Sequence, residues 1–129
     1  MKTLMIIVTV LSVITIVYGI NQTRLKKYHM NFAKCLEEKG GTAEKPSPEA
    51  VVCLVVKDGD ILNANGEYTR EKAMKGIEDA ISDPSTIQKA KAMYNKCHDE
   101  AEQSGVTGYE QTIKIAGCSS PVLAFFDKI

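Results

Sequence analysis

The stretch from Ser47 to Val56 is the most apolar run of the sequence outside its first twenty residues, and Cys53 lies within it. Because the run is apolar on every side, it belongs at the centre of the folded chain. Its valine-rich second half would also suit a buried strand. However, Ser47 followed by Pro48 is the pattern of a helix N-cap with a first-turn proline, and no second strand-like segment is present to pair with it. We therefore predict a short buried helix.

Residues 1–19 have the three parts of a secretory signal peptide. Lys2 supplies the positive start, residues 4–17 form an apolar core, and Val17 and Gly19 occupy the small-residue positions before the expected cleavage. The alternative, a membrane anchor, needs about 20 apolar residues and is usually followed by a basic cluster. We expect a secreted, extracellular mature chain, residues 20–129, that forms one domain and does not insert into membranes.

The charge balance and the histidines exclude several classes of function. The sequence has 16 basic and 16 acidic residues, so the loss of Lys2 leaves a net charge of −1. No basic run or stripe is present, which makes nucleic acids and anionic membranes poor partners. The only histidines, His29 and His98, have no nucleophile at a recognisable catalytic spacing, so we expect no enzyme activity and no cofactor. His98 is either a plain surface side chain or a pH switch for ligand release.

Four cysteines, Cys35, Cys53, Cys97 and Cys118, lie in the mature chain. An even number of cysteines in a small secreted domain predicts two disulfides, and three pairings are possible. Pairing in sequence order would close loops of about twenty residues, each stabilising the fold by about 3 kcal/mol in the loop-entropy picture. A zinc site is the alternative, but no Cys-x-x-Cys pair occurs and the two histidines are far apart. We therefore expect disulfides and no metal.

Apolar side chains recur with the period of an amphipathic helix in the segments 24–39, 69–82, 85–103 and 107–118. The strongly apolar tail, residues 122–129, is expected to dock onto the other helices rather than fray. With the buried central run, these segments predict an all-α fold. We expect a compact bundle of five to six short helices around an apolar cavity, stapled by two disulfides. Helices this short are stable only when they pack together.

Several predicted helices begin at a capping side chain. Asp83 stands before a first-turn proline, and Thr107 with Glu110 has the spacing of a capping box. The first helix has two alternatives at its start: Asn21 begins a glycosylation sequon, and its last residue, Thr23, is also a candidate N-cap.

The order of the cysteines, together with the signal peptide and the small helical domain, resembles the insect odorant-binding protein family, which includes the pheromone-binding proteins. Members of that family typically have six cysteines. Glu49 stands four positions before Cys53, where the family has its second cysteine. Tyr109 stands nine positions before Cys118, where the family has its fifth. Because these two family cysteines bond to each other, their joint absence is the pattern of the four-cysteine C-minus subclass.

The resemblance implies the pairings Cys35–Cys53 and Cys97–Cys118. It also implies a secreted carrier that binds and solubilises a small hydrophobic molecule, such as an odorant or pheromone, with a membrane receptor as a further candidate partner. The chain would act as a monomer or a weak homodimer. Residues 40–46 leave no room for the second helix of the family. The alternative function is a secreted protein-binding or effector factor of saliva, venom or seminal fluid on the same scaffold.

The candidate ligand contacts are large side chains on the inward faces of the predicted helices, although ordinary core packing is the alternative role for each. Met74 and Met93 suit a pocket that accepts several ligand shapes, and Tyr94 and Tyr109 are the candidates for a polar contact. We also hypothesise that Glu49 and Tyr109 hydrogen-bond to each other in place of the missing disulfide. The candidate lining residues are Tyr28, Phe32, Val52, Val55, Leu62, Met74, Ile77, Met93, Tyr94, Ile113, Leu123, Phe125 and Phe126.

Overall fold

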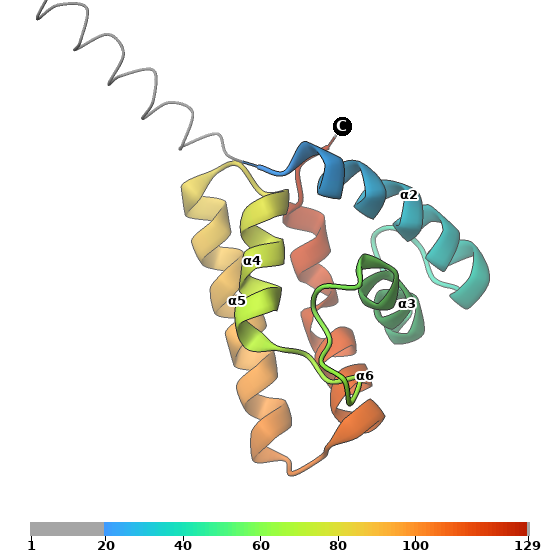
Figure 1. Cartoon of the computed structure of the whole chain (residues 1–129), viewed down its shortest axis with the longest axis vertical. Helices are drawn as coiled ribbons and strands as arrows, with labels where there is room; N and C mark the ends of the chain where they lie inside the picture. Colours follow the sequence, from blue (N-terminus) through green and yellow to red (C-terminus); the bar gives the residue numbers. More distant parts are fainter. Residues whose placement is uncertain (1–19, 129) are drawn as a thin grey trace, which may run out of the picture.

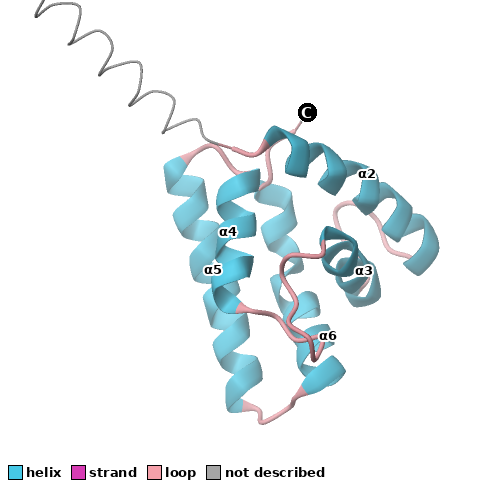
Figure 2. Cartoon of the chain, viewed as in Figure 1, coloured by secondary structure: helices cyan, strands magenta, loops and turns pink. Residues whose placement is uncertain are grey.

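Five α-helices and one short 3-10 helix follow one another along residues 20–128, the part of the chain that this computed structural model describes (Figure 1, Figure 2). The predicted signal peptide, residues 1–19, lies outside the described residues, as does residue 129. Within residues 20–128 no extended strand forms, since only two isolated β-bridges occur there, and the predicted all-α fold is confirmed. The elements are α2 (Gln22–Lys39), α3 (Pro48–Asp58), α4 (Arg70–Ala80), α5 (Pro84–Gln103), α6 (Gly108–Ser119) and η1 (Ser120–Phe125).

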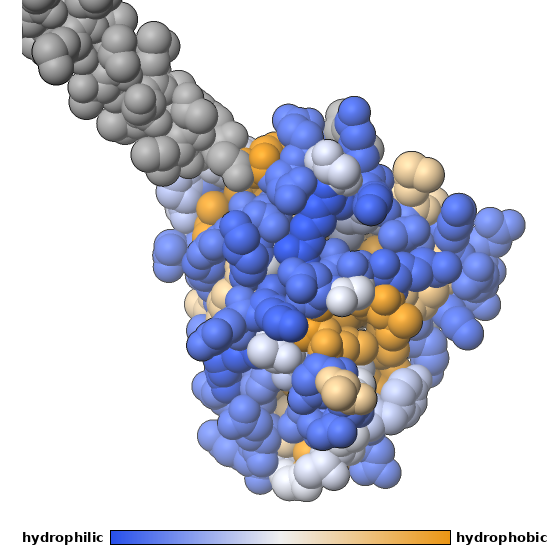
Figure 3. Space-filling model, in the orientation of Figure 1, coloured by the Kyte–Doolittle hydropathy of each residue, from blue (hydrophilic) through white to orange (hydrophobic). Residues whose placement is uncertain are grey.

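Helix α3 is largely buried, as its apolar sequence predicts, but it is not enclosed on every side, because Val56 is exposed. It packs against both α2 and α6, and five of its eleven residues are buried. Helix α5 packs against α4, α6 and η1, and Figure 1 shows α4 and α5 side by side. Figure 3 shows a largely hydrophilic face with an apolar area over α3, the helix in which Val56 is 58% exposed.

Local capping fixes the start of two helices as the sequence predicts. The Ser47 hydroxyl accepts the N–H of Ala50 at 3.0 Å, which begins α3. The Asp83 carboxylate accepts the N–H of Thr86 at 2.8 Å, which begins α5. In both helices a proline occupies the first turn, where a missing N–H leaves no hydrogen bond unmade.

Two other predicted capping interactions do not form, although Thr107 does occupy the N-cap position of α6. Helix α2 begins at Asn21, whose side chain accepts the N–H of Arg24 at 3.0 Å, so Thr23 is not its N-cap. Thr107 makes no capping hydrogen bond, and the predicted capping box of α6 does not form. Instead the carboxylate of Glu67 accepts the N–H of Gly108 at 2.7 Å. This partner comes from 41 residues earlier in the chain, which a local sequence pattern cannot reveal.

The two disulfides join neighbouring helices of the bundle. Cys35–Cys53 links α2 to α3 with a Cα–Cα distance of 5.7 Å. Cys97–Cys118 links α5 to α6 with a Cα–Cα distance of 5.6 Å. The pairing implied by the resemblance is therefore confirmed. Each crosslink limits how far apart two helices of the same core can move.

The C-terminal tail docks onto the bundle, as its apolar sequence predicts. Val122 is only 5% exposed and belongs to the main core cluster. Beyond η1, the backbone N–H of Asp127 donates to the Ala80 carbonyl at 2.8 Å, and the Asp127 carboxylate accepts the N–H of Ser82 at 3.2 Å. His29 Nε2 lies 2.8 Å from the Asp127 carbonyl oxygen. The tail is thus held by contacts to both α2 and the α4–α5 turn.

The hypothesised hydrogen bond between Glu49 and Tyr109 does not form. Tyr109 is 61% exposed in the first turn of α6, and Glu49 is exposed in the first turn of α3. Both side chains face solvent, so the packing of α3 against α6 stands alone where the family resemblance would place a disulfide. Tyr109 is also wrong as a candidate for a buried polar contact, because its phenol is not buried.

Candidate ligand-binding site

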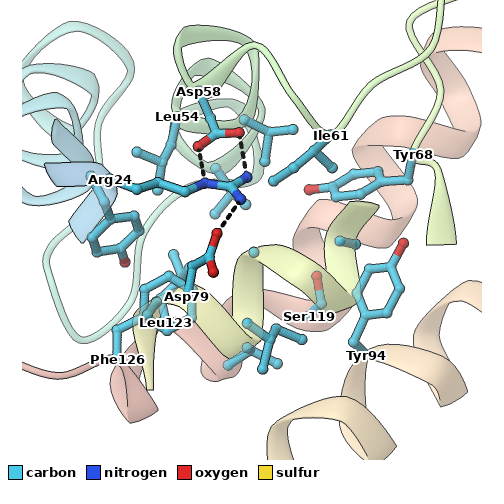
Figure 4. A pocket seen from close by; sticks show the side chains of 18 of the residues that line it. Arg24, Leu54, Asp58, Ile61, Tyr68, Asp79, Tyr94, Ser119, Leu123 and Phe126 are labelled. Carbon is cyan, nitrogen blue, oxygen red and sulfur yellow. Dashed lines mark hydrogen bonds and ion pairs between the residues drawn. The ribbon is translucent and has the colours of Figure 1, made fainter. Parts of the chain in front are cut away.

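An apolar cavity of about 90 Å³ lies inside the bundle (Figure 4). Residues of α2, α3, α4, α5, α6 and η1 all contribute to its wall. The cavity therefore exists only when all the described helices are packed together. Its wall is mostly aliphatic and aromatic, which suits a small hydrophobic molecule better than a polar one.

Six of the thirteen predicted lining residues line this cavity. They come from α2, α3, α4, α5 and the C-terminal segment, so residues far apart in the sequence meet at one place. Whether each one contacts a ligand stays a prediction. The six are Tyr28, Val55, Ile77, Tyr94, Leu123 and Phe126.

The other seven predicted residues do not line the cavity. Phe32 packs against the small cluster of Cys35, Ala50 and Leu54, and Val52 is buried in the main core. The rest are partly buried against the main core, which is the ordinary packing role that the sequence also allowed. These residues are Leu62, Met74, Met93, Ile113 and Phe125.

Sequence reasoning missed the polar part of the cavity wall. Figure 4 shows Arg24, Asp58 and Asp79 together at one side of the cavity, with Tyr68 and Tyr94 across from them. Arg24 lies 34 positions from Asp58 and 55 positions from Asp79, so no local spacing connects the three. The helical period could have identified several of the missed apolar residues. The missed apolar residues are Leu25, Val51, Leu54, Ile61, Ala73, Ala80 and Val122, of which Ile61 lies in a loop and has no helical period.

Arg24 holds two carboxylates at the edge of the cavity. Its guanidinium binds Asp58 through two hydrogen bonds, Nε to Oδ1 at 2.9 Å and Nη2 to Oδ2 at 2.7 Å. Its Nη1 donates to Asp79 Oδ2 at 3.0 Å, and Lys75 Nζ lies 3.0 Å from the other oxygen of Asp79. The hydrogen bond to Asp58 raises the pKa of Arg24 above its ordinary value, although burial opposes this rise. These two basic and two acidic groups leave no net charge beside the cavity.

A polar groove of about 380 Å³ lies next to the cavity and shares part of its wall. Asparagine, threonine and lysine side chains of α2 and its N-cap line the rest of the groove, together with Lys57, Asp60 and Lys75. The Arg24 ion pairs therefore stand between the polar groove and the apolar cavity. The residues common to both spaces are Arg24, Tyr28, Leu54, Asp58 and Asp79.

A buried hydrogen-bonded pair supports the opposite side of the cavity. The Tyr94 hydroxyl lies 2.8 Å from His98 Nδ1, and His98 Nε2 lies 3.0 Å from a carboxylate oxygen of Glu102. His98 is only 5% exposed, so its interpretation as a plain surface side chain is wrong. Burial lowers the pKa of His98, the positive charge of Arg70 lowers it further, and Glu102 partly opposes both. The imidazole therefore favours its neutral form and acts first as a support for Tyr94.

Tyr28 differs from Tyr94 in its hydrogen bonding. Its hydroxyl is buried and has no hydrogen-bond partner among the described residues. Its ring packs against Phe126 and Phe32, with centroids 4.5 Å and 5.8 Å away. Burial raises the pKa of Tyr28 well above its usual range, so the phenol keeps its proton. A buried hydroxyl without a partner is uncommon in folded proteins.

The sequence pattern of the ant venom allergen Sol i 2 family matches residues 34–123, which are more than half of the chain and include all four cysteines. The chain belongs to this family. No solved structure matches it. The Sol i 2 family is distinct from the odorant-binding proteins, so the match supports the small disulfide-bonded insect protein that the resemblance implied but not its olfactory role.

The part of the chain that matches the Sol i 2 family carries most of the candidate site. It begins inside α2, includes α3 to α6 and ends within η1. Asp58, Tyr68, Asp79 and Tyr94 lie inside the matched region, whereas Arg24 lies before it. The first turns of α2 and Phe126, which follows the matched region, therefore complete the cavity of this Sol i 2 family member.

Residues 20–128 contain neither a metal-binding cluster nor a membrane-spanning helix. Among residues 20–128 no group of three or more His, Cys, Asp or Glu side chains is arranged to hold a metal ion. In the same described part of the chain, no helix combines the length and apolar character needed to cross a membrane.

Proposed function

We propose that this protein is a secreted venom component that binds one small hydrophobic molecule in the cavity inside its helical bundle. The observation that carries the proposal is the apolar cavity itself, whose wall is built by every described helix. Membership in the ant venom allergen family and the predicted signal peptide support release into venom.

The size of the cavity limits the ligand. Its volume of about 90 Å³ is below the roughly 300–1,000 Å³ of ordinary ligand pockets and below the ~150 Å³ cavity that holds benzene in an engineered protein. A ligand of benzene size would therefore have to displace part of the wall. Burial of its apolar surface would supply about 25 cal/mol per Å² before the costs of binding are subtracted.

Two other roles compare with this proposal: a carrier in chemosensory fluid, and a venom effector that acts by binding another protein. The family match favours venom over chemosensory fluid. The protein-binding effector is the second candidate function, because the cavity is small and the apolar side chains of Met30 and Val56 are largely exposed. The venom carrier and the protein-binding effector differ in what the protein carries when it is isolated from its natural secretion.

Native mass spectrometry of the secreted protein separates these candidates. A carrier should show an added small mass that is lost when the protein is denatured in the instrument, while both disulfides remain. The same spectrum reports whether the chain is a monomer or a weak dimer. A protein that arrives without a small molecule, fails to displace an apolar fluorescent probe and captures a protein partner would refute the carrier role.

A further inference from the structure

Tyr68 places an unpaired hydroxyl at the cavity. Its side chain is only 8% exposed and lines the cavity wall. In Figure 4 the Tyr68 hydroxyl points across the cavity toward the side where Arg24 lies, and no hydrogen bond joins it to the other residues drawn. None of the hydrogen bonds among residues 20–128 involves this hydroxyl, whereas the neighbouring Tyr94 hydroxyl is bound to His98. The Tyr68 ring is buried, but its oxygen keeps some accessible surface, unlike the fully buried oxygen of Tyr28, so a group that enters the cavity can reach it.

The chemistry of that hydroxyl decides which group it can recognise. Burial raises the pKa of Tyr68 far above its ordinary value, so the phenol keeps its proton. Its O–H is therefore available as a hydrogen-bond donor. The matching group on a ligand is an acceptor, such as a carbonyl or ether oxygen.

The charges around the cavity determine whether the ligand is neutral. The carboxylates of Asp58 and Asp79 are already paired with Arg24 and Lys75. A cation entering the cavity would find no unpaired carboxylate, and an anion would face both aspartates. Because an unpaired charge in an apolar cavity is strongly unfavourable, a neutral ligand fits best.

We propose that the ligand of this cavity is a small neutral molecule with one hydrogen-bond acceptor, and that the Tyr68 hydroxyl donates to that acceptor. This inference rests on the proposed function, because it names the class of molecule that the cavity binds. Tyr68 thereby determines specificity: it distinguishes an oxygen-containing ligand from a hydrocarbon of the same shape.

Two isosteric probes test the inference on the mature, disulfide-bonded chain. Cyclopentanone and methylenecyclopentane have nearly the same shape, but only the ketone has an acceptor. Their dissociation constants are measured by protein-detected NMR titration in the wild type, in Tyr68→Phe and in the control Tyr109→Phe. The Tyr109 side chain is 61% exposed and does not line the cavity, so the removal of its hydroxyl should change neither constant.

The expected result is a selective loss of ketone binding in Tyr68→Phe. Loss of one neutral hydrogen bond should weaken cyclopentanone binding roughly five- to tenfold, while methylenecyclopentane binding changes less than about twofold. The carbonyl carbon of bound ¹³C-labelled cyclopentanone should also show the downfield shift of a hydrogen-bonded carbonyl in the wild type. This second measurement does not depend on the folding of any variant.

Three results would overturn the inference, and they differ in what else they remove. If neither probe binds the wild type, the proposed function fails as well. If both probes bind but Tyr68→Phe causes no selective loss of ketone binding relative to Tyr109→Phe, the assignment to Tyr68 is wrong and the carrier role stands. A bound carbonyl with the shift of a ketone in hexane also removes the hydrogen bond.

Discussion

Replacing Gly76 with alanine should make the protein more stable and its cavity smaller at the same time. Gly76 lies inside α4 and lines the cavity. An added Cβ would lie 3.4 Å from Arg24 Nη2 and 3.6 Å from Ile61 Cδ1. Both atoms are the far ends of flexible side chains, so a small shift accommodates the methyl group. Alanine is favoured over glycine in a helix by about 0.8–1 kcal/mol, and we expect the free energy of unfolding to rise by about 0.5–1 kcal/mol.

Gly117→Ala is the matched control for this change. Gly117 lies inside α6, and a Cβ added there would lie 3.4 Å from Cγ in the ring of Pro48. This residue does not line the cavity. The stability gain should therefore be similar in the two variants, but only Gly76→Ala should weaken ligand binding.

Urea denaturation and titration with cyclopentanone measure the two effects. Adding a methyl group to a filled apolar site costs about 1–3 kcal/mol, so cyclopentanone should bind Gly76→Ala at least about fivefold more weakly than Gly117→Ala. Equal affinities in the two variants would show that the ligand does not occupy this cavity. A loss of stability in Gly76→Ala would refute the claim that the methyl group can be accommodated.

Three further perturbations test other parts of the structure. Replacing Cys97 and Cys118 together by serine removes a disulfide that joins residues 21 positions apart. The free energy of unfolding should fall by about 3 kcal/mol, and an unchanged urea midpoint would contradict the stabilising role of this disulfide. Arg24→Met leaves the 9%-exposed Asp79 carboxylate without its guanidinium partner. The free energy of unfolding should fall by about 2–3 kcal/mol. Adding Asp79→Asn should restore part of this loss in the same denaturation assay, and no recovery would argue against the ion pair. Because the pKa of His98 is lowered in the fold, its contribution is present above its ordinary pKa and is lost as pH falls through the lower folded value. Between about pH 7.5 and pH 5 the wild-type melting temperature should therefore fall more than that of His98→Gln, and equal slopes would refute the assignment.

Much of the fold follows from local patterns in the sequence. The period of the apolar residues predicts the helices, and Ser47 and Asp83 predict where two of them begin, because a capping side chain acts on the backbone three residues away. The predictions failed where a distant residue replaces a local one. At α6 the carboxylate of Glu67 takes the place of a cap by Thr107, and no pattern within the helix contains that information.

The candidate site could be predicted only in part. The helical period places Ile77 and Val55 on inward faces, and both line the cavity. The same period places Met74 and Ile113 inward, yet they pack against the core away from the cavity wall. An inward face identifies a buried residue, but it does not tell whether the space beside that residue is filled.

The sequence by itself determined that this chain forms short amphipathic helices and one more apolar, largely buried helix, because helix period and burial are properties of neighbouring residues. Only the tertiary structure decided where the helices fail to fill the space between them, and which polar groups stand beside that space. Arg24, Asp58 and Asp79 meet there from three helices, and Tyr68 reaches it from a loop. Such an arrangement depends on how whole helices cross, which no stretch of neighbouring residues encodes.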